Sequence, residues 1–128
     1  MTKEEVIISL KKYGEIRLEQ QFIQTRLEHH SRRLAAAEKD HDKGMEQHRI
    51  DELEKVAEEN RRYMEDVEVC LDCMPPRQRR VLWHFYVRRS DDYIEILNEK
   101  LNVERSQIYR IKTKAEQTFA ALYTKTFY

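Results

Sequence analysis

The sequence predicts an all-α protein, and three observations indicate this fold class. The chain of 128 residues contains only two Gly and two Pro, the residues that most often interrupt helices. Charged residues make up 38% of the chain, well above the average of about 25% in globular domains. Apolar residues recur at alternating spacings of three and four along most of the sequence, which is the period of an amphipathic helix.

The first helical segment is expected over about residues 3–41, as one long helix or as two. Gly14 could kink or interrupt it, because Gly destabilises a helix interior by about 1 kcal/mol. The only expected turn in this part of the chain covers residues 40–44 and contains Gly44. The candidate core positions of the segment are Ile23, Leu27, His30, Leu34, Ala37 and His41.

A second helix is expected over about residues 46–73, and its apolar pattern is that of a coiled-coil seam. The seam positions are Ile50, Leu53, Ala57, Asn60, Met64, Val67, Leu71 and Met74. Two amphipathic helices joined by a short turn favour an antiparallel hairpin. Its narrow apolar stripe buries too little alone, so the hairpin should pack on the C-terminal part or on a second copy. Asn60 either sets the register within the seam or lies at its rim.

Pro75 and Pro76 should end the second helix and begin the next. We expect three further helices, over about residues 76–89, 92–101 and 104–123, with a loop at residues 90–92. The residues expected to face inward are Val81, Leu82, Phe85, Tyr86, Ile94, Leu97, Leu101, Ile108, Ile111 and Ala115. The aromatic tail, from Phe119 to Phe127 and Tyr128, should also be buried.

The charge distribution divides the chain into two modules. Residues 1–73 hold 13 Lys and Arg against 18 Asp and Glu, a net charge of −5. Residues 74–128 hold 11 against 6, a net charge of +5. We therefore expect a helical oligomerisation or partner-docking hairpin over 1–73 and a basic, nucleic-acid-binding domain over 74–128.

Two motifs in the basic half carry a resemblance to a known family. Met74-Pro75-Pro76-Arg77 resembles the opening of region 4 of sigma-70-type factors. The pattern Val103-x-x-Ser106-x-Ile108-Tyr109-Arg110-x-Lys112-x-Lys114-Ala115 is similar to that of phage transcriptional activators of the ArpU and RinA type. The similarity covers about residues 74–123. It implies a three-helix, sigma-region-4-like helix-turn-helix domain behind a helical N-terminal part.

The resemblance also implies which residues contact double-stranded DNA. Base edges in the major groove would be contacted from the first turns of the helix at 104–123, by Arg105, Ser106, Gln107, Tyr109 and Arg110. Arg suits guanine and Gln suits adenine. Phosphate contacts are expected from the basic side chains of this helix and of the helix at 76–89. These are Arg77, Arg79, Arg80, Lys112 and Lys114, with Arg88 and Arg89 nearby.

Several other function classes are disfavoured by the sequence. Cys70 and Cys73 form a CxxC pair without the second ligand pair that a zinc site needs, so we expect apolar packing and no metal. His29, His30, His41 and His48 have the spacing of partly exposed helix positions. No catalytic motif occurs, so neither an enzyme nor a cofactor is expected. No hydrophobic run approaches the length of about 18 residues that a membrane-spanning helix needs. No signal peptide is evident, so we expect a cytoplasmic protein.

These inferences converge on a transcriptional regulator of phage or prophage genes that binds specific DNA sequences and associates through its N-terminal helices. Two alternatives remain at this point. The chain could be a helical protein-interaction module that presents its basic face to an acidic protein. It could also be a sigma-like adaptor that binds RNA polymerase and has no DNA specificity of its own.

Overall fold

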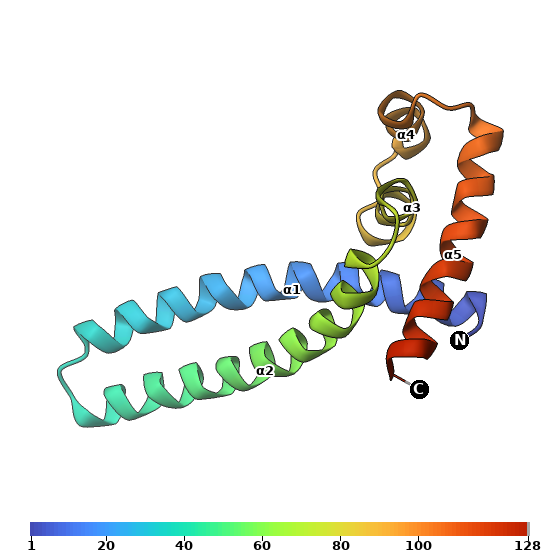
Figure 1. The fold of residues 1–128 in the computed structure, drawn as a ribbon. Coiled ribbons are helices and arrows are strands. Elements are labelled where there is room, and N and C mark those ends of the chain that lie inside the picture. The colour runs from blue at the N-terminus through green and yellow to red at the C-terminus, as the bar shows by residue number, and fades with distance from the viewer. Residues whose placement is uncertain (128) are drawn as a thin grey trace. The chain divides into compact units, whose positions relative to one another are not determined.

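The structure is a computed structural model that describes residues 1–127. The helices are α1 (Lys3–Ala36), α2 (Asp40–Asp72), α3 (Pro76–Leu82), the π-helix η1 (Trp83–Val87), α4 (Tyr93–Leu101) and α5 (Arg105–Phe127). Figure 1 shows them in chain order, from blue at the N-terminus to red at the C-terminus. No strand occurs in residues 1–127, so the all-α prediction is confirmed.

The turn between the two long helices was predicted in the wrong place. It covers residues 37–39, and Gly44 lies inside α2 rather than in a turn. Asp40 and Asp42 occupy the first turn of α2, where carboxylates are stabilised by the positive end of the helix dipole. The acidic residues therefore start the helix before Gly44 is reached. α1 continues through Gly14 without interruption.

The chain separates into two compact units, and both long helices pass from one unit into the other. Unit 1 comprises Met1–Glu15 and the chain from Glu65 onward, and unit 2 comprises Ile16–Met64. This division differs from the expected boundary after residue 73. The start of α1 and the last turns of α2 belong with the C-terminal helices because their apolar residues are buried there: Val6, Leu10, Val67, Cys70 and Leu71.

Unit 2 is an antiparallel pair formed by the distal parts of α1 and α2. Gln20 Nε2 donates to the Ala57 carbonyl at 3.0 Å and accepts from Asn60 Nδ2 through its Oε1 at 3.1 Å. Asn60 is half-buried in the seam and has a defined polar partner. The predicted seam of α2 is confirmed, because each of its positions from Ile50 to Met74 is buried or half-buried.

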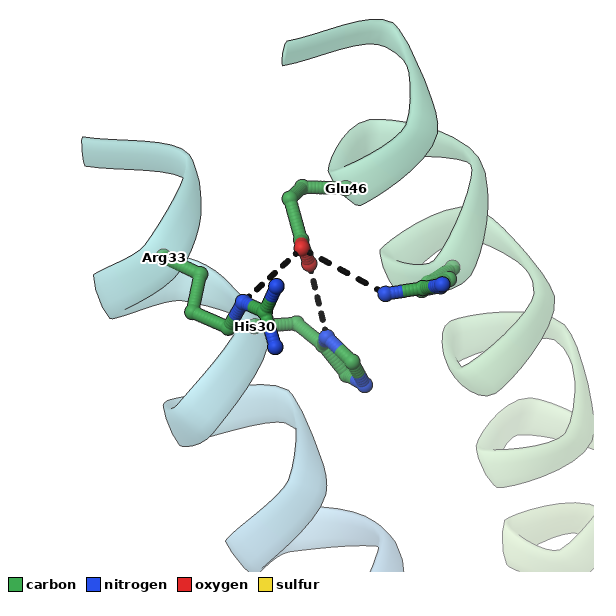
Figure 2. A network of polar contacts seen from close by, with 4 residues as sticks. His30, Arg33 and Glu46 are labelled. Carbon is green, nitrogen blue, oxygen red and sulfur yellow. Dashed lines mark hydrogen bonds and ion pairs between the residues drawn. The ribbon is translucent and has the colours of Figure 1, made fainter. Parts of the chain in front are cut away.

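A buried carboxylate joins the two helices near the far end of unit 2. Glu46 is 5% exposed, and its Oε2 lies 2.7 Å from His30 Nδ1. Its Oε1 accepts from Arg33 Nε at 3.0 Å and from Arg49 Nη1 at 3.4 Å. Figure 2 shows His30 and Arg33 converging from α1 on Glu46 of α2. The hydrogen bond from His30, and then the charges of Arg33 and Arg49, lower the Glu46 pKa against the opposing effect of burial.

The core of unit 1 is formed by the inward faces that the sequence predicts. Val81, Phe85, Leu97 and Ile108 form one buried cluster. The half-buried side chains packed against it are Tyr86, Tyr93, Ile94, Leu101, Val103 and Ile111. Leu82 and Ala115 are fully buried as well. The three-four spacing of these residues therefore identified the core of the C-terminal helices correctly.

The helix that begins at Pro76 changes to π geometry at Trp83. The Arg88 N–H donates to the Trp83 carbonyl at 2.9 Å, a bond that spans five residues. The single helix predicted over residues 76–89 therefore ends two residues early and contains this wider turn. Such π segments are rare and occur frequently at functional sites.

The aromatic tail is buried only in part. Phe119 is fully buried, and Tyr123 stacks on it with ring centroids 6.2 Å apart. Phe127 is 38% exposed, so its predicted burial is wrong. It lies in the last turn of α5, beyond the part of the helix that covers the core. Tyr128 lies outside the described residues. None of the helices in residues 1–127 combines the length and the apolar character needed to cross a membrane.

Candidate nucleic-acid interface

A tight turn sets the start of α5 relative to α4. Asn102 ends α4 in the left-handed conformation, with φ 53°, and Asn is one of the few residues that tolerates it. Val103 then packs on the core cluster. The Glu104 N–H donates to Gln107 Oε1 at 3.3 Å, which satisfies one backbone group at the helix start. Gln107 therefore supports the turn with its side-chain oxygen.

The two long sides of α5 have different chemistry. Ile108, Ala115 and Phe119 are fully buried. Ser106, Gln107, Arg110 and Lys114 are exposed. Four of the residues predicted to contact DNA thus lie on the solvent side of one helix, and the apolar residues between them anchor the helix to the core.

Arg77 of α3 joins two of these residues at one groove. The groove has a volume of about 480 Å³ and is lined by Pro75, Pro76, Arg77, Gln78, Arg110, Ile111 and Lys114. Arg77 and Arg110 are far apart in the sequence and come from different helices. Packing of α3 on α5 therefore brings three predicted DNA-contacting cations, Arg77, Arg110 and Lys114, to one surface.

Arg105 and Tyr109 form a pair at the beginning of α5. The Arg105 guanidinium lies 5.9 Å from the centroid of the Tyr109 ring, and the Tyr109 ring packs edge-on against Phe85 at 5.7 Å. A hydrogen bond from Arg105 lowers the pKa of Tyr109, and the same bond raises the pKa of Arg105. Contact with Phe85 therefore holds the Tyr109 ring against the core, and the Arg105 guanidinium lies beside that ring.

Lys112 differs from the other predicted phosphate-binding residues. Its side chain is 17% exposed, and its Nζ lies 3.7 Å from Glu116 Oε1. The ammonium also lies 5.6 Å from the centroid of the Phe85 ring. Glu116 is buried and accepts a 2.6 Å hydrogen bond from the Tyr86 hydroxyl. Lys112 thus compensates a buried carboxylate, and its position does not favour a phosphate contact.

Arg79 and Arg80 lie at a second cleft, apart from the groove that contains Arg77. This cleft has a volume of about 710 Å³ and its lining includes Arg79, Arg80, Trp83, His84, Arg88 and Lys100. Arg79 Nη1 lies 3.9 Å from Asp72 Oδ1. Arg89 points elsewhere, because its Nη2 donates to the Tyr93 hydroxyl at 2.8 Å. The expected phosphate-binding arginines are therefore divided between two surfaces.

The sequence patterns do not predict Trp83, His84 or Lys100 as site residues. Burial lowers the pKa of His84, and the charges of Lys100 and Arg80 lower it further. Arg80 and His84 are four residues apart, which is a neighbour spacing on one helix face. That spacing was the available signal for His84, whereas Lys100 reaches the cleft only through the packing of α4.

The cysteines have two different environments. Cys70 is buried, and burial, followed by the nearby Cys73 and Asp66, raises its pKa to about 11. Cys73 is exposed, so the expectation of apolar packing fits Cys70 and not Cys73. Within residues 1–127, no group of three or more His, Cys, Asp or Glu side chains is arranged to hold a metal ion.

Comparison of the chain with protein-family models, with curated proteins and with solved structures finds no match.

Proposed function

We propose that this protein is a non-enzymatic transcriptional regulator that binds specific sequences of double-stranded DNA through the exposed side of α5. The observation that carries the proposal is the groove at which Arg110 and Lys114 of α5 meet Arg77 of α3. A helix that presents Arg and short polar residues to solvent suits the major groove. Cations on a neighbouring helix suit the phosphates that flank it.

The roles within this surface follow from the chemistry of each side chain. Arg110 is the best candidate for a base contact, because Arg donates two hydrogen bonds to the O6 and N7 atoms of guanine. Ser106 and Gln107 are exposed in the turn before it. Arg105 and Tyr109 flank these positions, with the Arg105 guanidinium 5.9 Å from the centroid of the Tyr109 ring. Arg77 and Lys114 act as phosphate contacts, and Lys112 has no role in this surface.

The resemblance to phage activators of the ArpU and RinA type supports control of phage or prophage genes. A single small domain makes few base contacts, so useful affinity requires a second half-site or a protein partner. The proposal therefore includes self-association through the N-terminal helices, with RNA polymerase as a further candidate partner.

Selection of bound duplexes from a random pool tests the proposal directly. We expect the purified full-length protein to enrich one motif. Arg110→Ala should weaken binding to that motif by about 1–3 kcal/mol and relax the preference at one base pair. Arg77→Ala and Lys114→Ala should weaken binding to all duplexes alike and reduce the salt dependence by about one phosphate each.

Lys39→Ala is the matched control, because Lys39 is an exposed lysine in the turn of unit 2. It should change neither affinity nor salt dependence. Binding at low salt without an enriched motif would contradict the proposal and favour the protein-interaction module. Enrichment that requires added RNA polymerase would favour the sigma-like adaptor instead.

A further inference from the structure

The second basic cleft is built by three parts of unit 1 that the sequence separates. Arg79 and Arg80 come from α3, Trp83 and His84 from η1, and Lys100 from α4. Arg88 follows directly after the π-helix. The cleft has a volume of about 710 Å³, within the range of about 300–1,000 Å³ typical of small-molecule sites. A pocket of this size is therefore formed by α3, η1 and α4 without a residue of α5.

The charges that line the cleft strongly favour an anion. Arg79, Arg80, Arg88 and Lys100 carry four permanent positive charges, and Asp72 is the only carboxylate in the lining. The Asp72 side chain is 79% exposed, and its 3.9 Å contact with Arg79 is long. Such a surface ion pair contributes little. The cleft thus retains about three uncompensated cations in a concave surface, an arrangement that suits a ligand with several phosphate oxygens.

Besides the charged residues, His84 and Ser90, the cleft has an apolar wall that includes the indole of Trp83. Pro76 and Ile96 also line the cleft, and Trp83 is half-buried with its ring edge-on to Tyr13 at 6.3 Å. An aromatic wall beside guanidinium groups suits a planar base attached to phosphates. We propose that this cleft binds a nucleoside polyphosphate, with its phosphates held by Arg79, Arg80, Arg88 and Lys100 and its base packed against Trp83.

A free nucleotide fits the cleft better than a duplex does. No residue of α5 lines the cleft, and its cations differ from those of the α5 groove, although Pro76 borders both. In a duplex the bases are stacked inside the helix and present no free face to Trp83, whereas a nucleotide presents both its base and its phosphates. A nucleotide within single-stranded nucleic acid has the same base and phosphate chemistry. Titration with both ligands distinguishes a free nucleotide from a single strand.

His84 provides an internal reporter of the bound anion. Burial lowers its pKa, and the charges of Lys100 on α4 and Arg80 on α3 lower it further. Arg79, Arg88 and Asp72 are the other charged groups in the lining. A bound polyphosphate would offset these positive charges, so ligand binding should raise the His84 pKa and be accompanied by proton uptake.

Fluorescence titration offers a clear test, because Trp83 is the only tryptophan of the chain. Full-length protein is titrated with ATP, GTP, inorganic pyrophosphate and a single-stranded oligonucleotide. We expect ATP or GTP to change the Trp83 emission and to bind at least about ten-fold more tightly than pyrophosphate, since pyrophosphate has no base to stack. Equal affinity for pyrophosphate, or tighter binding of the oligonucleotide, would overturn the assignment.

Matched charge variants complete the test. Arg80→Gln and Lys100→Gln should each weaken nucleotide binding about ten-fold or more and move the shift of the His84 NMR signal to correspondingly higher nucleotide concentration. Arg110→Gln, on the other surface, should leave nucleotide binding unchanged while it impairs duplex binding. A lack of any response to millimolar ATP and GTP, or equal loss in Arg110→Gln, would refute the nucleotide site whatever the outcome for duplex DNA.

Discussion

Gly14 lies directly against the backbone of Val87, so that a Cβ atom at position 14 would overlap the Val87 carbonyl oxygen. Gly14 lies in the interior of α1, and Val87 is the last residue of the π-helix. A glycine that weakens its own helix is therefore present because it allows two backbones to come close.

Gly14→Ala should destabilise the protein by about 1–3 kcal/mol, because backbone atoms cannot give way as a flexible side chain can. Gly44→Ala is the control, since nothing lies within 4 Å of a Cβ at that helical position. It should stabilise the protein by about 0.4–1 kcal/mol through the lower entropy of the unfolded chain. Urea denaturation measures both changes, and equal effects of the two variants would contradict the close contact at Gly14.

Tyr86→Phe should destabilise the protein by about 1–3 kcal/mol, because it removes the 2.6 Å hydrogen bond to the buried Glu116 carboxylate. Burial, and then the bond to Glu116, raises the pKa of Tyr86. A raised phenol pKa contributes stability below the unfolded value of 10 that is lost as pH rises above it. A double-mutant cycle with Glu116→Gln measures the coupling, and additive effects would show that the bond contributes nothing.

Acid should weaken unit 2 through Glu46. The folded-state pKa of this carboxyl is lowered, chiefly by His30, so the stability it contributes is present above the unfolded value of 4.5 and is lost as pH falls below it. Glu46→Gln should remove that part of the pH dependence, as followed by helical circular dichroism. Glu52→Gln, at an exposed position of the same helix, should retain it. Identical acid profiles for the two variants would disprove the role of Glu46.

One thiol per chain should react rapidly in the native protein. Cys73 is exposed, whereas Cys70 is buried and burial raises its pKa to about 11, and only the thiolate is an effective nucleophile. A thiol-reactive dye at pH 8 should therefore label one cysteine in the folded protein and both in denaturant. Cys73→Ser should abolish the rapid phase. Rapid labelling of that variant would mean that Cys70 is accessible.

The sequence by itself determined most of the helical segments and most of their buried positions, although the turn at 37–39 and the exposure of His41 and Phe127 differ from the prediction. The three-four spacing of Ile50, Val67, Leu97 and Ile108 identified core positions that are buried in the structure. The Pro75-Pro76 pair predicted the start of α3 at Pro76. These features depend on the order of residues within a few turns, so periodicity and local backbone preferences are sufficient to predict them.

The tertiary structure alone decided which residues meet. Tyr86 and Glu116 are thirty residues apart, and Tyr86 bonds the buried carboxylate that Lys112, a predicted phosphate ligand, also approaches at 3.7 Å. Arg77 and Arg79 lie on different sides of α3, because positions two apart are about 200° apart around an α-helix, and they line different clefts. Neighbours along a helix point in different directions, and only the packing of other helices determines which surface each one joins.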